Sequence, residues 1–286
     1  MNKTIISNKL HAFIDLDGTM FHGSQAIDGA DRLIECLQEW GVPYLFVTNN
    51  STRTPQQIAA LMGEMGIQAR TEDVLTSAQA AAAYIRDHYK DPFVFMIGEE
   101  GLQQALTDCN IRWTNDPVVV EQKHIDVVVQ GLDRQFTYSK LEAASIAIRK
   151  GAASIVTNPD VQLPSDKGIS PGAGTIAAAI QAASGAAPIC IGKPDAIIME
   201  VALKQLDCTS AEAIVIGDNL LTDIQAGIRA KCLTALVLTG VTSKSSYASY
   251  RENSNDLPDY VFNNLEQVRQ LFEQIKENND TERALE

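Results

Sequence analysis

Short apolar runs alternate with longer amphipathic segments along most of this chain. The runs are rich in Val, Ile, Leu and Phe and predict strands at 10–15, 44–48, 93–97, 125–129, 154–156, 189–191, 213–217, 233–238 and 260–262. The amphipathic segments predict helices at 28–40, 55–66, 77–89, 99–108, 138–150, 174–183, 194–206, 222–230 and 265–275. This alternation is typical of βα units, so we expect an α/β fold with parallel sheets that are covered on both faces.

The middle of the chain has the pattern of a small α/β unit of its own. We therefore expect one α/β core, formed by residues 1–81 and 186–286, and a second α/β unit inserted at 82–185. Segment 157–174 contains Asn-Pro-Asp, Leu-Pro-Ser-Asp and Pro-Gly-Ala-Gly, which predict a loop. Near the amino end, Asp28 is the expected cap of the first helix.

Composition narrows the possible partners. The chain has 286 residues and a formal net charge of −13, with 45% hydrophobic residues, which is ordinary for a folded protein. An acidic balance argues against nucleic acid and against an anionic membrane surface as partners. A small phosphorylated metabolite remains compatible, because a few local cations can outweigh a distant net charge. A homodimer is left open.

Cysteine usage and the amino-terminal segment bear on the cellular compartment. The five cysteines include no C-x-x-C pair and are odd in number, so we expect buried free thiols and no disulfide framework. We find no pattern of a signal peptide and no apolar run of the length that spans a membrane. The expected location is the cytoplasm.

Polar side chains follow the ends of two predicted strands in the first part of the chain. Asp15 and Asp17 stand at the end of the first, before a glycine that permits a tight turn. Thr48, Asn49 and Asn50 follow the second, and their hydroxyl and amide groups could hold phosphate oxygens. Taken alone, the first cluster is more typical of an ordinary Asp-Gly turn, and the second could equally be a polar turn before a helix.

Two further strand ends carry charged residues in the second part of the chain. Lys193 follows a short strand between a glycine and a proline, and Asp218 follows a buried strand with Asp223 five residues later. A lone lysine is usually solvated, and Asp223 could simply be an acid in the first turn of a helix. Because ligands bind at the carboxyl ends of strands in open α/β sheets, the four clusters together predict one site.

A hard cation would explain so many carboxylates at one edge of a sheet. Clustered carboxylates repel one another unless a cation neutralises them, and oxygen ligands suit Mg²⁺. A magnesium ion and Lys193 could then both face a phosphate group in an otherwise acidic protein.

The order D-x-D-G-T, T-N-N-S, G-K-P and G-D-x-x-x-x-D resembles the haloacid-dehalogenase-like (HAD) superfamily. It is most similar to the branch of NagD-like sugar phosphatases and 4-nitrophenylphosphatases. The resemblance implies a Rossmann-like core with a mobile cap. It also implies a role for each matched residue: Asp15 as nucleophile, Asp17 as general acid and base, Thr48 and Lys193 as phosphate holders, Asp15, the Asp17 carbonyl and Asp218 as Mg²⁺ ligands, and Asp223 as an acid behind the ligands.

The spacing between these motifs indicates where a cap is inserted. Only 32 residues separate Asp15 from Thr48, whereas 144 separate Thr48 from Lys193, so the α/β cap is expected between the second and third motifs. The resemblance implies a Mg²⁺-dependent phosphatase for small phosphate monoesters that works through an aspartyl-phosphate. A phosphotransferase or mutase of the same superfamily, and a non-catalytic protein that binds phosphorylated metabolites, are the alternatives.

Overall fold

The chain folds into two compact units. The computed structural model describes residues 9–165 and 168–283. The first unit comprises the described residues up to Thr48, the segment Ile58–Val74 and the described residues from Ala202 onward. The second unit comprises Asn49–Gln57 and, apart from residues 166–167, Leu75–Val201. The domain boundaries expected at 81/82 and 185/186 stay a prediction.

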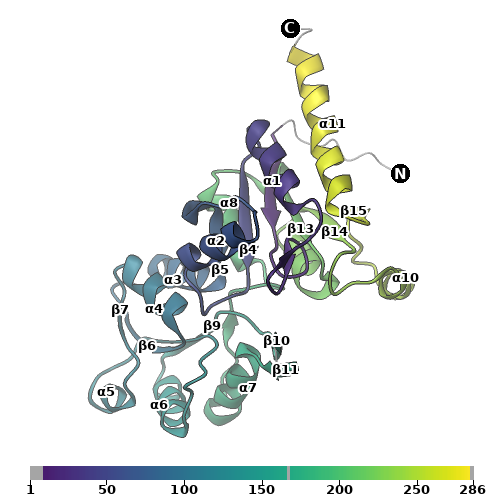
Figure 1. The fold of residues 1–286 in the computed structure, drawn as a ribbon. Coiled ribbons are helices and arrows are strands. Elements are labelled where there is room, and N and C mark those ends of the chain that lie inside the picture. Colours follow the sequence, from purple (N-terminus) through teal and green to yellow (C-terminus); the bar gives the residue numbers. More distant parts are fainter. Residues whose placement is uncertain (1–8, 166–167, 284–286) are drawn as a thin grey trace. The chain divides into compact units, whose positions relative to one another are not determined.

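A six-stranded sheet with the order β15-β14-β13-β1-β4-β5 forms the centre of the first unit (Figure 1). Its strands are β1 (His11–Ile14), β4 (Tyr44–Thr48), β5 (Val74–Thr76), β13 (Ala213–Gly217), β14 (Leu233–Val237) and β15 (Tyr260–Phe262). The chain runs outward from β1 through β4 and β5, and later continues from β13 on the other side of β1. Strand β1 pairs in parallel with both β13 and β4, so the strand order reverses beside β1. A reversal of this kind marks the usual position of a ligand site in open α/β sheets.

Side chains alternate between the two faces of this sheet with the period of two that strand geometry imposes. Ala12 and Ile14 of β1 point to the face covered by α1 (Ala30–Glu39) and α11 (Leu265–Arg283), where Leu33 and Phe272 are also buried. Against the other face pack the turn η3 (Leu220–Ile224), α9 (Gln225–Arg229) and α10 (Lys244–Asn253). The hairpin β2 (Phe21–His22) and β3 (Gln25–Ala26) follows β1. Helices α2 (Pro55–Glu64) and α8 (Ile197–Gln205) begin in the second unit and end in the first.

The second unit has a five-stranded parallel sheet with the order β12-β9-β8-β6-β7. Its strands are β6 (Phe93–Ile97), β7 (Arg112–Thr114), β8 (Val127–Gln130), β9 (Ala153–Val156) and β12 (Ile189–Cys190). Helices α3 (Ser77–His88) and α4 (Glu100–Asp108) lie on one side of this sheet, and α5 (Pro117–Gln122), α6 (Tyr138–Arg149) and α7 (Ala173–Ser184) lie on the other (Figure 1). The expected α/β architecture of parallel sheets is therefore confirmed.

The expected loop at 157–174 is partly wrong. An antiparallel hairpin of β10 (Gln162–Ser165) and β11 (Gly168–Pro171) forms within it. The residues Pro, Ser and Gly favour turns, but Pro164 lacks only the N–H donor and still adopts extended backbone in a two-stranded ribbon.

Three further details differ from the expectations. Asp28 does not cap α1, because Gly29 is the N-cap residue with a left-handed φ of 81° and no side-chain capping bond is present. The helix expected at 222–230 begins with the π-helical turn η3. Helix α11 continues to Arg283, beyond the expected end at 275.

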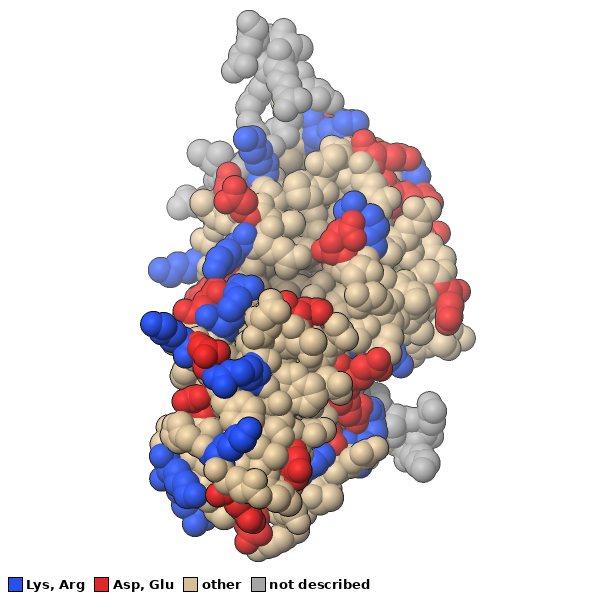
Figure 2. Space-filling model, turned by 90° about the vertical axis from the view of Figure 1, so that its left-hand side faces the viewer, with Lys and Arg blue, Asp and Glu red and all other residues tan. Residues whose placement is uncertain are grey.

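Charges of both signs lie on the surface of the molecule. On the face shown in Figure 2, Lys and Arg side chains are interspersed with Asp and Glu side chains. Among the described helices, none is long and apolar enough to cross a membrane.

None of the five cysteines, all of which lie within the described residues, forms a disulfide, and Cys36 and Cys232 are buried. Burial raises the pKa of the Cys232 thiol from 9.0 to about 12. Because this pKa is higher in the folded state, the thiol favours folding below about pH 9, and that contribution is lost as the pH rises through about 12.

We therefore expect iodoacetamide at pH 8 to leave Cys232 unmodified in the native protein and to modify it readily in urea. Peptide mapping by mass spectrometry measures both. Equal rates of modification in the two states would contradict the burial of this thiol.

Candidate active site

Asp15 directly follows the buried strand β1 at the carboxyl end of the first sheet. Its backbone N–H donates to the carbonyl of Ile216 over 2.9 Å, which extends the pairing of β1 with β13 by one residue. The side chain is partly exposed, and the buried hydroxyl of Thr19 donates to its Oδ2 over 3.4 Å. Asp15 therefore presents its carboxylate at the sheet edge from a rigid backbone.

Asp218 follows β13 and lies beside Asp15 because the two strands are hydrogen-bonded neighbours. Its side chain is buried, and its Oδ2 accepts a hydrogen bond of 2.5 Å from the N–H of Val241. Asp223 is also buried and belongs to η3, where the N–H of Asn219 donates to its Oδ2 over 3.1 Å. A Cβ atom at Gly217 would lie 2.5 Å from Asp223 Oδ2, so a glycine is needed for this approach.

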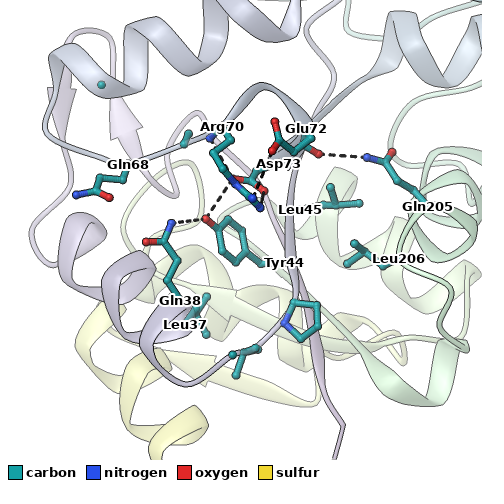
Figure 3. A pocket seen from close by; sticks show the side chains of 15 residues that line it. Leu37, Gln38, Tyr44, Leu45, Gln68, Arg70, Glu72, Asp73, Gln205 and Leu206 are labelled. Carbon is teal, nitrogen blue, oxygen red and sulfur yellow. Dashed lines mark hydrogen bonds and ion pairs between the residues drawn. The ribbon is translucent and has the colours of Figure 1, made fainter.

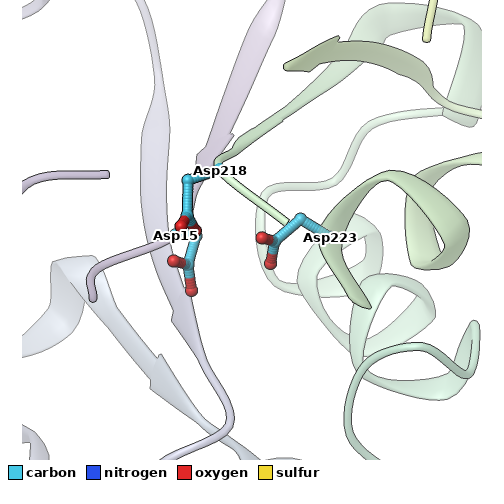
Figure 4. A group of neighbouring side chains, drawn as sticks. All are labelled: Asp15, Asp218 and Asp223. Atoms are coloured by element: carbon cyan, nitrogen blue, oxygen red, sulfur yellow. The ribbon is translucent and has the colours of Figure 1, made fainter. Parts of the chain in front are cut away.

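The three carboxylates Asp15, Asp218 and Asp223 form one cluster. One oxygen from each lies within 4.8 Å of the others. Figure 4 shows the side chains of Asp15 and Asp218 next to each other and the carboxylate of Asp223 turned toward them. Carboxylate oxygens are ligands for hard divalent cations, so this donor set could hold a metal ion. The structure thus assembles three of the four acids that the strand ends predicted.

Asp17 stands apart from this cluster. Its side chain is exposed at the start of the turn that follows β1, and its backbone forms an isolated bridge with Phe21. The turn is closed by a hydrogen bond of 2.8 Å from the N–H of Gly18 to the carbonyl of Phe21. Its roles as general acid and base and as a carbonyl ligand stay predictions.

Thr48 and Lys193 are both buried, each in its own unit. Thr48 is the last residue of β4, a direct neighbour of β1 in the first unit. Lys193 belongs to the second unit, where its side chain is only 2% exposed. Lysines are mostly exposed in folded proteins, so burial to this degree argues against an ordinary surface lysine.

Asn49 holds the backbone of Lys193 through a reciprocal pair of hydrogen bonds. The Lys193 N–H donates to Asn49 Oδ1 over 2.8 Å, and Asn49 Nδ2 donates to the Lys193 carbonyl over 2.9 Å. Asn49 Nδ2 also donates to Asp160 Oδ2 over 3.1 Å. A Cβ atom at Gly192 would lie 2.5 Å from Asn49 Oδ1, so a glycine before Lys193 lets the amide approach.

Asn50 has a different local role. Its Oδ1 accepts hydrogen bonds of 3.0 Å from the N–H groups of Thr52 and Arg53, which is the geometry of an Asx turn. The substrate-binding roles expected for Asn49 and Asn50 stay predictions.

The sequence patterns did not indicate the loop Thr239–Thr242, which follows β14. It contributes the Val241 N–H to Asp218, and Gly240 packs against the same carboxylate. The only sequence signal for this loop was a Thr-Gly pair after the predicted strand, and such a pair is common in turns that have no functional role.

A cavity of about 930 Å³ lies at the opposite end of the first sheet (Figure 3). Tyr44, at the start of β4, lines it, and its hydroxyl lies 2.8 Å from Gln38 Nε2 and 3.4 Å from Asp73 Oδ2. Arg70 binds the Asp73 carboxylate with two nitrogens. Because β4 runs parallel to β1, this cavity and the carboxylate cluster occupy opposite edges of the sheet.

Comparison with known proteins agrees with this geometry. The family described as haloacid dehalogenase-like hydrolase matches residues 12–112, and a HAD-hydrolase-like family matches residues 190–268. An acid sugar phosphatase of Staphylococcus aureus is 42% identical over 89% of this chain and 95% of its own length.

Two solved structures have the same fold over most of their length. A mutant of the thermostable p-nitrophenylphosphatase of Bacillus stearothermophilus superposes with a TM-score of 0.81 at 42% identity, over 90% of this chain and 97% of that one. NagD of Escherichia coli K-12 superposes with a TM-score of 0.81 at 28% identity, over 90% of this chain and 96% of that one. With its strand-end carboxylates and these relatives, the chain belongs to the haloacid dehalogenase-like hydrolases.

Proposed function

We propose that this chain is a Mg²⁺-dependent phosphatase that hydrolyses small phosphate monoesters, such as sugar phosphates or related metabolites. The observation that carries the proposal is the Asp15–Asp218–Asp223 cluster at the carboxyl end of parallel strands. The names of the relatives, acid sugar phosphatase and p-nitrophenylphosphatase, support the same substrate class.

Asp15 is the proposed nucleophile. Its carboxylate attacks phosphorus, the bond from phosphorus to the ester oxygen breaks, and an aspartyl-phosphate forms. Water then attacks this intermediate and releases inorganic phosphate and free Asp15. Covalent catalysis divides one difficult displacement into two easier ones, and the rigid backbone at the end of β1 supports the alignment that the attack needs.

Asp17 is the proposed general acid and base. It would give a proton to the leaving alkoxide and take one from the attacking water. The exposed position of its side chain, two residues after Asp15, supports this role because the group can exchange protons with solvent between turnovers.

Thr48 and Lys193 are the proposed phosphate-binding residues, together with Asn49 and Asn50, which follow Thr48 in the chain. Thr48 ends the strand next to β1, and the backbone of Lys193 is bound by the residue that follows Thr48. At about 4 Å and an effective dielectric of about 20, a lysine and a phosphate charge attract by about 4 kcal/mol before desolvation.

Asp15 and Asp218 are the proposed side-chain ligands of Mg²⁺, with the Asp17 carbonyl as a third ligand. The bound ion would neutralise charge on the phosphoryl oxygens. Asp223 is proposed to lie behind the ligands and to orient them.

A screen for phosphate release tests the proposal. Purified protein with Mg²⁺ is incubated with a panel of phosphorylated sugars, other phosphorylated metabolites and 4-nitrophenyl phosphate. We expect free phosphate from several of them. Transfer of the phosphoryl group to a second metabolite instead of water would indicate a phosphotransferase. A ligand-dependent thermal shift without product would indicate a non-catalytic binding protein.

Asn49→Ala is expected to raise the KM for 4-nitrophenyl phosphate more than it lowers kcat. The change removes two hydrogen bonds to the Lys193 backbone, each contributing about 1 kcal/mol, so the KM is expected to rise by up to about 30-fold. Initial rates at saturating Mg²⁺ measure both constants. Asn253→Ala, at an exposed position on α10, is the control. An unchanged KM would contradict the positioning role of Asn49.

The proposed reaction implies a small phosphorylated metabolite as the partner of this site. The homodimer and the cytoplasmic location stay predictions.

A further inference from the structure

The buried carboxylate of Asp218 lies between two glycines that are far apart in the sequence. A Cβ atom at Gly18, or one at Gly240, would lie 2.6 Å from Asp218 Cγ, much closer than atoms can approach. Gly18 has a φ of +85°, so a side chain there would also strain the backbone. Gly240 does not have a left-handed φ, so its backbone conformation would accept alanine. The methyl group would meet the Asp218 carboxylate first and, at 2.7 Å, the carbonyl oxygen of Gly18 as well.

The loop Thr239–Thr242 also binds Asp218 through hydrogen bonds. The Val241 N–H donates to Asp218 Oδ2 over 2.5 Å, and the Thr242 N–H donates to the Asp218 carbonyl over 3.1 Å. Both the backbone and the side chain of this acid are therefore fixed by one short segment. A charged acceptor makes such hydrogen bonds stronger than neutral ones.

The same loop is attached to the turn that follows β1. The hydroxyl of Thr239 donates to the Gly18 carbonyl over 2.8 Å, and His22 Nε2 donates to the Thr239 carbonyl over 2.7 Å. The loop thus connects the Asp17–Gly18 turn to Asp218 through hydrogen bonds. Both are distant from the loop in the sequence.

We propose that Gly240 and Val241 are positioning residues of the metal site. Gly240 leaves room for the Asp218 carboxylate, and the main-chain N–H of Val241 sets its rotation by binding Oδ2. This inference rests on the proposed function only in taking Asp218 as a ligand of Mg²⁺. The side chain of Val241 has no part in it, since it is 72% exposed.

The main experiment is a titration of the purified, metal-free protein with Mg²⁺ by isothermal calorimetry, without substrate. Gly240→Ala is expected to raise the Kd for Mg²⁺ at least about 10-fold, because a methyl group at this position turns the carboxylate away. Gly63→Ala in α2 is the matched control, because a Cβ atom there meets nothing within 4 Å. An unchanged Kd in Gly240→Ala would overturn the inference, and so would an equal loss of binding in Gly63→Ala.

A second measurement keeps the inference testable if Gly240→Ala folds poorly. Thermal unfolding without metal is compared for Gly240→Ala in the natural sequence and in Asp218→Ala. The melting temperature should fall more in the first background than in the second, because Asp218→Ala removes the carboxylate that the methyl meets and leaves only the Gly18 carbonyl oxygen, 2.7 Å from a Cβ atom at Gly240. An equal fall in both would show that the methyl meets something other than Asp218.

Phosphate release is measured separately, so the two proposals can fail independently. If the unmodified protein binds Mg²⁺ and Gly240→Ala weakens that binding, the inference holds even when no substrate is hydrolysed. If phosphate is released while the Mg²⁺ affinities of both proteins agree, the proposed function stands and the inference fails.

Discussion

Asp15→Asn is expected to lower the rate of phosphate release by about 1000-fold or more while the protein stays folded. An amide is a poor nucleophile, so no aspartyl-phosphate can form. The side chain is partly exposed, and asparagine has nearly the same shape, so the packing of β1 should not change. Turnover of 4-nitrophenyl phosphate measures the first effect, and circular dichroism with thermal unfolding measures the second.

Asp28→Asn is the matched control for this experiment. It makes the same chemical change in the first unit, at a position where the side chain does not cap α1. Its activity should equal that of the unmodified protein. If Asp15→Asn kept near-normal turnover, covalent catalysis by this residue would be refuted, whatever the metal requirement.

Removal of divalent metal is expected to stop phosphate release, and Mg²⁺ is expected to restore it. Three carboxylates with oxygens within 4.8 Å repel one another unless a cation neutralises them. Chelation by EDTA, followed by addition of Mg²⁺ in excess, measures this directly. Full activity in metal-free buffer would contradict the proposed role of the cluster.

The same repulsion predicts an effect on stability. Mg²⁺ binds the folded state, so it should raise the melting temperature, by an amount equivalent to about 2.7 kcal/mol at 100 times its Kd. Asp218→Asn should remove most of this Mg²⁺-dependent rise, because one carboxylate of the cluster is gone. Melting curves with and without Mg²⁺ for both proteins test this. An equal Mg²⁺-dependent rise in both proteins would show that Asp218 does not take part in holding the ion.

The local pattern of apolar and polar residues was sufficient to predict where the chemically important residues lie. Strand β1 was recognisable from its apolar run. Because the strand ends where that run ends, the first polar residue after it, Asp15, was expected at the end of the strand. The same reasoning placed Asp218 after β13. The carboxyl ends of neighbouring parallel strands lie at the same edge of a sheet. Once the α/β pattern was recognised, Asp15 and Asp218 were therefore expected to lie close together.

Local pattern failed where the structure depends on pairing with a distant segment. The hairpin of β10 and β11 contains turn-forming residues, and only their mutual hydrogen bonds make them strands. The Asp28 prediction failed for a local reason, since Gly29 begins the helix with a left-handed backbone and without a side-chain cap. Nothing in the local pattern around Asn49 indicated that its amide holds the Lys193 backbone in the second unit.

The sequence by itself determined the α/β class, the strand ends that carry chemistry and the family, because these depend on short-range periodicity and on residues close together in the chain. Only the tertiary structure decided that Asn49 holds Lys193 and that the loop Thr239–Thr242 binds Asp218. These contacts join residues that the folded chain alone brings together. Their energies come from buried hydrogen bonds and from close steric limits, which leave no periodic signal in the sequence.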